Sequence, residues 1–369
     1  MRKLVDWGNL EELPLSLVLD KLEEHIDHIR FAVVCKNWLS IAKLNHKNHQ
    51  FRISIPPMIM SVPIESNSSR SLYSLLSHKE YSIQFSSIEF IICHGSSFGW
   101  LSLVHSNGAI TLLNPFKYGI IPPISLPPLE SPPLKYLRSV TLSADPIISP
   151  DDYVAVVIYN YRHMAFRRAN QPFWIPIVTN LSYFNDVAFY KGMLVADAHS
   201  DTIQSFKFNT PPPDRSNDPN FTYYENITST KYRVRAQDYA GQTHLVKSLN
   251  GDIWMVKRYL IYVKKLSYGL DVYKLKLDAQ SGKLVQMNRL KSLGDNILFI
   301  GYRGNSFSLS ASCFSKLKKD SVYFLCEGVS EDLGFGVYNV KDGSYQIQSL
   351  PPSFKQVQFF WALPQFQWD

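Results

Sequence analysis

The chain has 369 residues and a net charge of +7, which is long enough for two or three domains. Its 14% aromatic residues favour strands, and its four cysteines are too far apart for a disulfide framework or a zinc site. Because the N-terminus lacks a signal peptide and no apolar run could span a bilayer, we expect an intracellular protein of the cytoplasm or nucleus, without membrane contact.

The basic excess does not indicate nucleic acid. Residues 1–50 hold seven Lys/Arg and seven Asp/Glu, so the excess lies beyond them. It is densest over 231–303, where basic and apolar residues alternate, as in Tyr273-Lys274-Leu275. Such alternation is typical of the solvated face of a sheet, so we expect no nucleic-acid partner.

A first amphipathic helix is predicted to begin at Leu13-Pro14, because proline is favoured in the first turn of a helix. Its apolar stripe recurs at the spacing i, i+3, i+4, i+7, and consists of Leu15, Val18, Leu19 and Leu22.

A second helix is predicted to follow Asp27 as its N-cap. One apolar stripe contains Phe31, Val34, Cys35 and Trp38, and another contains Ile29, Ala32 and Val33. A unit of about fifty residues cannot cover both stripes by itself. The second stripe is therefore expected to pack either on the rest of this chain or on a partner protein.

The order of these residues resembles an F-box, whose pattern is W-x-x-L-P, a leucine-rich helix, and then R-x-V-C-x-x-W. The matching residues are Asp6, Trp7, Leu13, Pro14, Leu17, Val18, Leu22, Arg30, Phe31, Val33, Val34, Cys35, Lys36, Asn37 and Trp38. The resemblance implies docking to a Skp adaptor and, through it, to a cullin. The adaptor-facing or supporting residues would be Leu13, Pro14, Leu17, Val18, Val33 and Trp38. Leu39 departs from the pattern, since many members carry Arg there.

Residues 51–71 are expected to be a linker, because Pro56 to Ser71 is rich in proline and serine. Beyond it the period of the apolar residues changes to two. Trp100–Val104 and Ala109–Leu113 flank the turn Ser106-Asn107-Gly108, which predicts a hairpin. Similar units recur at 153–161, 187–208, 251–277 and 321–347.

These units are comparable in spacing with, or longer than, the roughly 40 to 50 residues of a propeller blade. About 300 residues of antiparallel units exceed the usual single β-sandwich, so a degenerate β-propeller with large loops is predicted. The last apolar segment, 359–364, is expected to form a buried strand that closes the ring against a strand near the start of the domain.

Several strings resemble a plant F-box family whose C-terminal domain is the KIB-type β-propeller, formerly a domain of unknown function. They lie at 139–146, 184–192, 244–248, 251–256, 272–275, 292–301 and 336–338. Asn170–Phe173 is a departure, because the family has Gly-Asp before Trp174. The resulting expectation is an α+β multidomain chain, with a three-helix F-box over 1–50, a linker over 51–71 and a mostly antiparallel all-β propeller over 72–369.

Catalytic motifs are absent from the sequence. His25 with His28, and His46 with His49, have helical spacing but lack an acidic or cysteine ligand, so we expect surface histidines and no metal. No G-x-S-x-G elbow, Walker loop or H-E-x-x-H motif is present. We therefore expect a non-enzyme without a cofactor.

A group of aromatic and arginine residues is a candidate for target contact, because such residues are enriched at interfaces. Its members are Tyr161, Arg162, Phe166, Arg167, Arg168, Phe173 and Trp174. The alternative is that the aromatic residues are core and the arginines solvated.

The resemblance implies the substrate receptor of an SCF-type ubiquitin ligase, in which the helices dock the adaptor and the propeller binds an unidentified target protein. One alternative is a propeller that binds or inhibits a protein without ubiquitination. Another is a propeller enzyme.

Overall fold

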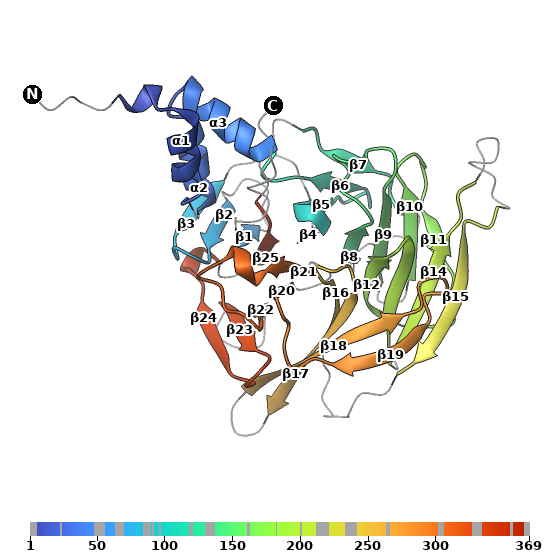
Figure 1. Cartoon of the computed structure of the whole chain (residues 1–369). Coiled ribbons are helices and arrows are strands. Elements are labelled where there is room, and N and C mark those ends of the chain that lie inside the picture. The colour runs from blue at the N-terminus through green and yellow to red at the C-terminus, as the bar shows by residue number, and fades with distance from the viewer. Residues whose placement is uncertain are drawn as a thin grey trace, which may run out of the picture.

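The chain forms a ring of β-sheets with short helices beside it (Figure 1). This computed structural model describes residues 6–22, 24–47, 56–62, 70–83, 90, 92–95, 97–117, 121–129, 137–160, 163–181, 183–199, 201–211, 221–232, 242–262, 266–301, 306–326, 334–354 and 357–364. Within these residues the strands make six sheets, which are the blades of a β-propeller.

Blades 1 to 4 each contain four antiparallel strands in chain order. Blade 1 comprises β4 (Ile92–Gly95), β5 (Leu101–Val104), β6 (Ile110–Leu113) and β7 (Ile124–Leu126). Blade 2 comprises β8 (Leu137–Leu142), β9 (Val154–Tyr159), β10 (His163–Arg168) and β11 (Ile175–Ile177). Blade 3 comprises β12 (Phe184–Tyr190), β13 (Met193–Ala198), β14 (Thr202–Phe208) and β15 (Tyr224–Lys231). Blade 4 comprises β16 (Gln242–Lys247), β17 (Ile253–Tyr262), β18 (Leu266–Leu277) and β19 (Leu284–Arg289).

Blades 5 and 6 depart from chain order. Blade 5 has the spatial order β21 (Phe307–Ser310), β20 (Asn296–Ile300), β22 (Ser321–Cys326), β23 (Gly334–Asn339) and β24 (Tyr345–Ser349). Its strands β20 and β22 are parallel. Blade 6 has the order β25 (Gln358–Ala362), β1 (Met58–Val62), β2 (Arg70–Ser74) and β3 (Glu80–Ile83).

The core lies between the blades, because each sheet is apolar on both faces. Val104 of blade 1 packs in one cluster with Val140 and Val157 of blade 2, while Ile158, on the other face of blade 2, packs with Phe206 of blade 3. This alternation along β9, with all six residues buried, explains why its sequence is a continuous apolar run. The propeller prediction is thus confirmed.

The ring closes through strands from the two ends of the domain. Residues 358–362 of β25 pair antiparallel with residues 58–62 of β1. Trp361, almost fully buried, donates a hydrogen bond from its indole nitrogen to the carbonyl of Ile300 in blade 5 at 3.0 Å. The predicted closing strand is therefore confirmed, and it joins blades 5 and 6.

The predicted linker over 51–71 is wrong where the structure describes it. Met58–Val62 forms β1 with every residue buried, and β2 begins at Arg70. The propeller therefore begins at Met58 instead of residue 72. β1 pairs with β2 on one side and with β25 on the other, and β25 lies about 300 residues away in sequence.

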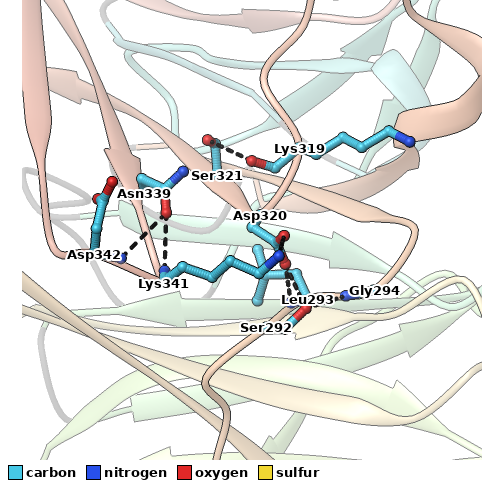
Figure 2. A network of polar contacts seen from close by, with 9 residues as sticks. All are labelled: Ser292, Leu293, Gly294, Lys319, Asp320, Ser321, Asn339, Lys341 and Asp342. Atoms are coloured by element: carbon cyan, nitrogen blue, oxygen red, sulfur yellow. Dashed lines mark hydrogen bonds and ion pairs between the residues drawn. The ribbon is translucent and has the colours of Figure 1, made fainter.

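Asp320 joins three segments of blade 5 (Figure 2). Its carboxylate accepts hydrogen bonds from the Ser292 hydroxyl at 2.6 Å and the Leu293 amide at 2.7 Å, and it pairs with Lys341 at 2.9 Å. These contacts tie the connection from β19 to β20, the start of β22 and the turn between β23 and β24. They hold in place a blade whose parallel strand departs from the usual hairpin order.

The two faces of the ring follow from strand direction. A blade of four antiparallel strands starts and ends on the same face, so the connections within its outer and inner strand pairs lie on the opposite face. We call that opposite face the helix-side face, because the chain enters β1 there from the helices. Its segments include 97–100, 143–153, 191–192, 248–252 and 311–320.

The helices are η1 (Trp7–Asn9), α1 (Glu12–Leu19), α2 (His25–Ala32) and α3 (Lys36–Lys47), with further short turns η3 (Ser97–Gly99), η5 (Ala311–Cys313) and η6 (Pro352–Phe354) in the propeller. Helix α1 confirms the first prediction, with Pro14 in its first turn. No helix in the described part of the chain is long and apolar enough to cross a membrane.

The second predicted helix is wrong in its continuity. It divides into α2 and α3, with a turn at Val33–Cys35, where two adjacent β-branched residues weaken helical preference. Asp27 is not the N-cap: that position is Glu24, and Asp27 pairs with Arg30 at 3.1 Å. Two residues of the predicted stripe, Phe31 and Trp38, contact each other across the break with ring centroids 4.5 Å apart, whereas Val34 of the same stripe is 55% exposed.

Deleting residues 358–369 should abolish cooperative unfolding, because β1 would lose its inner partner and Trp361 would leave the interface between blades 5 and 6. Thermal unfolding followed by circular dichroism and size exclusion checks this. Deleting only 365–369 is the control and should leave the melting temperature unchanged. A soluble, cooperatively melting protein after the longer deletion would contradict the closure.

Candidate functional site

The N-terminal helices form a small unit with its own core. Leu15, Leu19, Phe31, Ala32, Ile41 and Ala42 are buried together there. They account for the inner side of α1, the inner side of α2 and the middle of α3. The residues on the outer side of the same helices are not part of this core.

Large apolar side chains are exposed on this unit. On α1, Leu13 is 70% and Leu17 54% exposed, with Val18 beside them at 38%, and Val33 in the turn between α2 and α3 is 72% exposed. Trp7 and Val34 are also exposed. Leu13 and Leu17 lie one turn apart on α1, and exposed apolar residues that adjoin in this way indicate a protein-binding surface. We call Leu13, Leu17, Val18, Val33 and Val34 the apolar helix surface.

The propeller does not cover this surface. The second predicted stripe is divided: Ala32 is buried in the core of the helical unit, while Val33 remains 72% exposed in the intact chain. Pro14 is exposed as well, whereas Trp38 is only half-buried. Trp38 therefore supports the surface from within, and the other five predicted residues lie on its outside.

Side chains of α3 hold the segment before α1 in place. The Asn37 side-chain amide donates to the carbonyls of Gly8 at 3.2 Å and Leu10 at 2.9 Å. The Trp38 indole nitrogen donates to the carbonyl of Trp7 at 2.9 Å. These bonds fix where α1 starts, and so fix the position of Leu13. The sequence pattern pointed to Trp38, but it gave no sign of the part that Asn37 plays.

In the described part of the chain, a hydrogen bond between side chains links the helical unit to the propeller. The Ser74 hydroxyl, at the end of β2, donates to the Glu24 carboxylate at 2.9 Å. Ser74 also accepts from the amides of Leu76 and Ser77 at 3.2 Å each, so its hydroxyl is held in one direction. The helical unit is thus anchored beside blade 6.

The predicted target-contact group is wrong in its aromatic part. Phe166 is fully buried and Trp174 is 8% exposed, with its indole nitrogen bonded to the Pro127 carbonyl at 2.8 Å. Both are core residues of the blade interfaces. Their place in the apolar alternation of β10 and β11 would have indicated this.

The arginines of that group are not solvated either. Arg167 is 9% exposed and donates to the Ala169 carbonyl at 3.0 Å, while Arg168 donates to the Asn209 carbonyl at 3.1 Å. Burial lowers the pKa of Arg168, an effect that Asp152 opposes. Arg162 and Tyr161 lie outside the described residues. Arg168 thus joins blade 2 to blade 3, and the described residues of the predicted target-contact group do not form an exposed surface.

Two buried carboxyl groups lie opposite each other on β12 and β13. Asp186 and Asp197 are cross-strand partners, and both are almost fully buried. Asp186 accepts from the Leu245 amide of blade 4 at 2.9 Å, and Asp197 accepts from the Tyr232 hydroxyl at 2.7 Å. Burial raises the pKa of Asp186 to about 7 and that of Asp197 to about 6.

The Asp186 carboxyl group joins blade 3 to blade 4, whereas Asp197 accepts hydrogen bonds from Asn185 of its own blade and from Tyr232, which follows that blade. Nearby His244 is buried, and this burial, helped by Arg258 and Arg138, lowers its pKa to about 3. Among the described residues, no three His, Cys, Asp or Glu side chains come together as metal ligands would. The geometry therefore points to the apolar helix surface as the candidate site.

Comparisons with known proteins identify the propeller. The family model described as the KIB1-4 beta-propeller matches residues 72–339. No curated protein matches the chain.

Solved structures with a similar fold include the β-propeller domain of Cps50 (Swd1) from Myceliophteria thermophila, at 11% identity and a TM-score of 0.34 over 80% of each chain. The N-terminal domain of Nup159 has 12% identity and a TM-score of 0.34, over 80% of this chain and 85% of that one. AztD from Citrobacter koseri has 11% identity and a TM-score of 0.38, over 68% and 59%. Similarities this low support no inference about function.

Replacing Asn37 by Ala should loosen residues 6–10, because the carbonyls of Gly8 and Leu10 lose their donor, at a cost of about 1–3 kcal/mol. Hydrogen exchange of these residues should accelerate while exchange in the propeller stays unchanged. Ser40→Ala, on the same helix and exposed, is the control. Unchanged exchange at residues 6–10 would show that Asn37 does not hold them.

The stability of the propeller should fall as the pH rises from about 5 to 8. The pKa of Asp186 is about 7 in the folded state, against about 3.9 when unfolded, so the folded state binds more protons in this range and loses that advantage above pH 7. Asp186→Asn should flatten the pH dependence of the urea midpoint.

Asp342→Asn, in an exposed turn, is the control for this measurement and should keep the wild-type slope. His244 contributes with the opposite sign in both proteins, because its pKa is lowered on folding, and so it cancels in the comparison. Equal slopes for Asp186→Asn and the wild type would contradict the assignment.

Proposed function

The chain belongs to the KIB1-4 β-propeller family, and on this premise we propose that it is the target-binding subunit of a Skp–cullin–F-box ubiquitin ligase. The helical unit docks a Skp adaptor, and the propeller holds the target protein. The compartment is the cytoplasm, the nucleus or both. No residue of this chain carries out bond chemistry in the proposed role.

The exposure of the apolar helix surface is the observation that carries this proposal. Leu13, Leu17, Val18 and Val33 are the residues that the F-box resemblance assigns to adaptor contact, and all four are exposed. An amphipathic helix surface of this kind fits a hydrophobic groove, in which each fully buried Leu or Val contributes about 1.5–3 kcal/mol.

The proposed mechanism is proximity. A target held by the propeller and a ligase scaffold held by the helices are parts of one assembly, so ubiquitin transfer becomes effectively intramolecular. The Glu24–Ser74 hydrogen bond supports this role, because it limits how far the two parts turn relative to each other. The specificity then lies in the propeller and the reactivity in the partner enzymes.

Replacing Leu13 and Pro14 together by Ala should weaken binding to a recombinant Skp adaptor by about a hundredfold or more, since two exposed anchors of about 1.5–2 kcal/mol each are lost. Calorimetric titration and co-purification measure this. The melting temperature should stay within about 2 °C, because neither side chain is buried.

Val178→Ala with Val285→Ala is the matched control, since these propeller residues are 72% and 60% exposed. This control should bind the adaptor normally. Wild-type affinity of the Leu13/Pro14 variant would refute the proposal. If that variant loses the adaptor yet keeps its effect on a target in cells, the protein acts by binding alone, without ubiquitination.

A further inference from the structure

The inner loops of the helix-side face carry exposed apolar side chains. Phe98 is 40% exposed in the loop after the inner strand of blade 1, Ile148 is 63% exposed in the corresponding loop of blade 2, and Leu249 is 46% exposed in that of blade 4. In the described part of the propeller, the other large apolar residues of similar exposure are Val178, Tyr183 and Val285. Val178 and Tyr183 lie in the connection between blades 2 and 3, on the opposite face of the ring, and Val285 lies on the outer strand of blade 4.

The loops that carry Phe98 and Ile148 are held side by side. The Ser97 hydroxyl accepts from the Leu142 amide at 3.0 Å, and the Trp100 indole nitrogen donates to Asp145 at 3.0 Å. Phe98 itself has a φ of 59°, a left-handed conformation that is strained for a bulky side chain. The hydrogen bonds of Ser97 and Trp100 therefore hold the backbone in a conformation that leaves the Phe98 ring partly exposed to water.

Leu249 is fixed in the same way on the far side of the ring. Its amide donates to the side-chain oxygen of Asn296 in blade 5 at 2.9 Å. The neighbouring Lys247 carbonyl accepts from the Ser308 hydroxyl at 2.7 Å. Blades 4 and 5 are thus locked together around Leu249, so binding there costs little ordering of the loop.

Charge on this face is unevenly distributed. Exposed lysines lie on blades 3 to 5, namely Lys191, Lys247, Lys316, Lys318 and Lys319. The acid groups on the same side of blades 4 and 5 offset these lysines only in part. Asp252 is half-buried and pairs with Lys274, while the exposed Asp278, Asp295 and Asp342 accept hydrogen bonds from serines and keep their charge. On the blade 2 side the exposed charges are Asp151 and Asp152. A bound segment is therefore favoured when its acidic residues lie over blades 4 and 5.

We propose that the helix-side face is the target-binding surface, and that it takes an acidic segment of a protein with apolar side chains, laid across the ring from Phe98 and Ile148 to Leu249. This inference rests on the proposed function, in which the propeller binds a target. The helical unit is anchored at the end of β2 on this same face, so the target lies on the side of the ring from which the ligase extends. This surface takes the place of the target-contact group predicted from the sequence, whose aromatic residues are buried.

The test is site-specific photo-crosslinking in cells that express the full chain, with a proteasome inhibitor to preserve targets. A photoreactive phenylalanine analogue replaces Phe98 or Leu249, and replaces Val178 or Val285 as matched exposed controls. The readout is the sequence of each crosslinked peptide by mass spectrometry. We expect positions 98 and 249 to capture the same protein through a net acidic segment with apolar residues, with yields at least about tenfold above the controls.

A second pair of variants tests the charge argument. Lys318→Glu with Lys319→Glu should reduce the crosslink from position 249 by about fivefold or more, whereas Lys231→Glu, on the outer strand β15, should leave it unchanged. Crosslinks of equal yield from Val178, a captured segment that is net basic, or no capture from positions 98 and 249 would overturn the proposal.

The Leu13/Pro14 double variant separates the two proposals. If it loses the adaptor and keeps the crosslinks, both stand. If the wild type binds no adaptor but crosslinks an acidic segment from positions 98 and 249, the surface stands and the ligase role fails. If the adaptor binds and only the control positions crosslink, the ligase role stands and this surface is wrong.

Discussion

The pairing of β25 with β1 is the contact on which the rest of the molecule depends. A propeller blade buries each of its faces against a neighbour, so an open ring leaves two apolar faces in water. Here the pairing places Trp361 between blades 5 and 6, where it contacts the Phe299 and Phe335 rings. The same pairing fixes β1, and β1 is the strand that leads back to the helices.

The repeating part of the fold was predictable because its signals are local. Turns such as Lys191-Gly192 and Asn107-Gly108 stand between strands of alternating pattern, and each hairpin appears where it was expected. Blade 6, which combines strands from both ends of the chain, was not predictable in the same way. Met58–Val62 stands between Pro57 and Pro63 in a stretch rich in proline and serine, and its inner partner β25 lies far away in sequence. Because the strands of this blade come from both ends of the chain, the repeat pattern of the sequence does not reveal it.

In the candidate site, too, some features follow from the local sequence and others only from the tertiary structure. The resemblance to an F-box assigned Leu13, Leu17 and Val18 to an outer surface, and all three are exposed. The helical spacing had instead placed Val18 in one stripe with Leu15 and Leu19, which are buried. The sequence left open whether Phe166 and Trp174 belong to an interface or to the core, and the packing of the neighbouring blades shows that they are core residues. Exposed loop residues such as Phe98 and Leu249 carry no pattern at all, and only the topology brings them to one face.

Blade 6 combines strands from both ends of the chain, so it is completed only at the end of the synthesis of the protein. The helical unit and β1 leave the ribosome about 300 residues before β25, which at roughly 5–20 residues per second is about 15–60 seconds. During that interval β1, whose five residues are all buried in the finished ring, lacks its inner neighbour and is a segment for chaperones to protect. The helices can therefore be folded and exposed while the ring beside them is still open. A chain that stalls before β25 would display the apolar helix surface beside an open ring of blades.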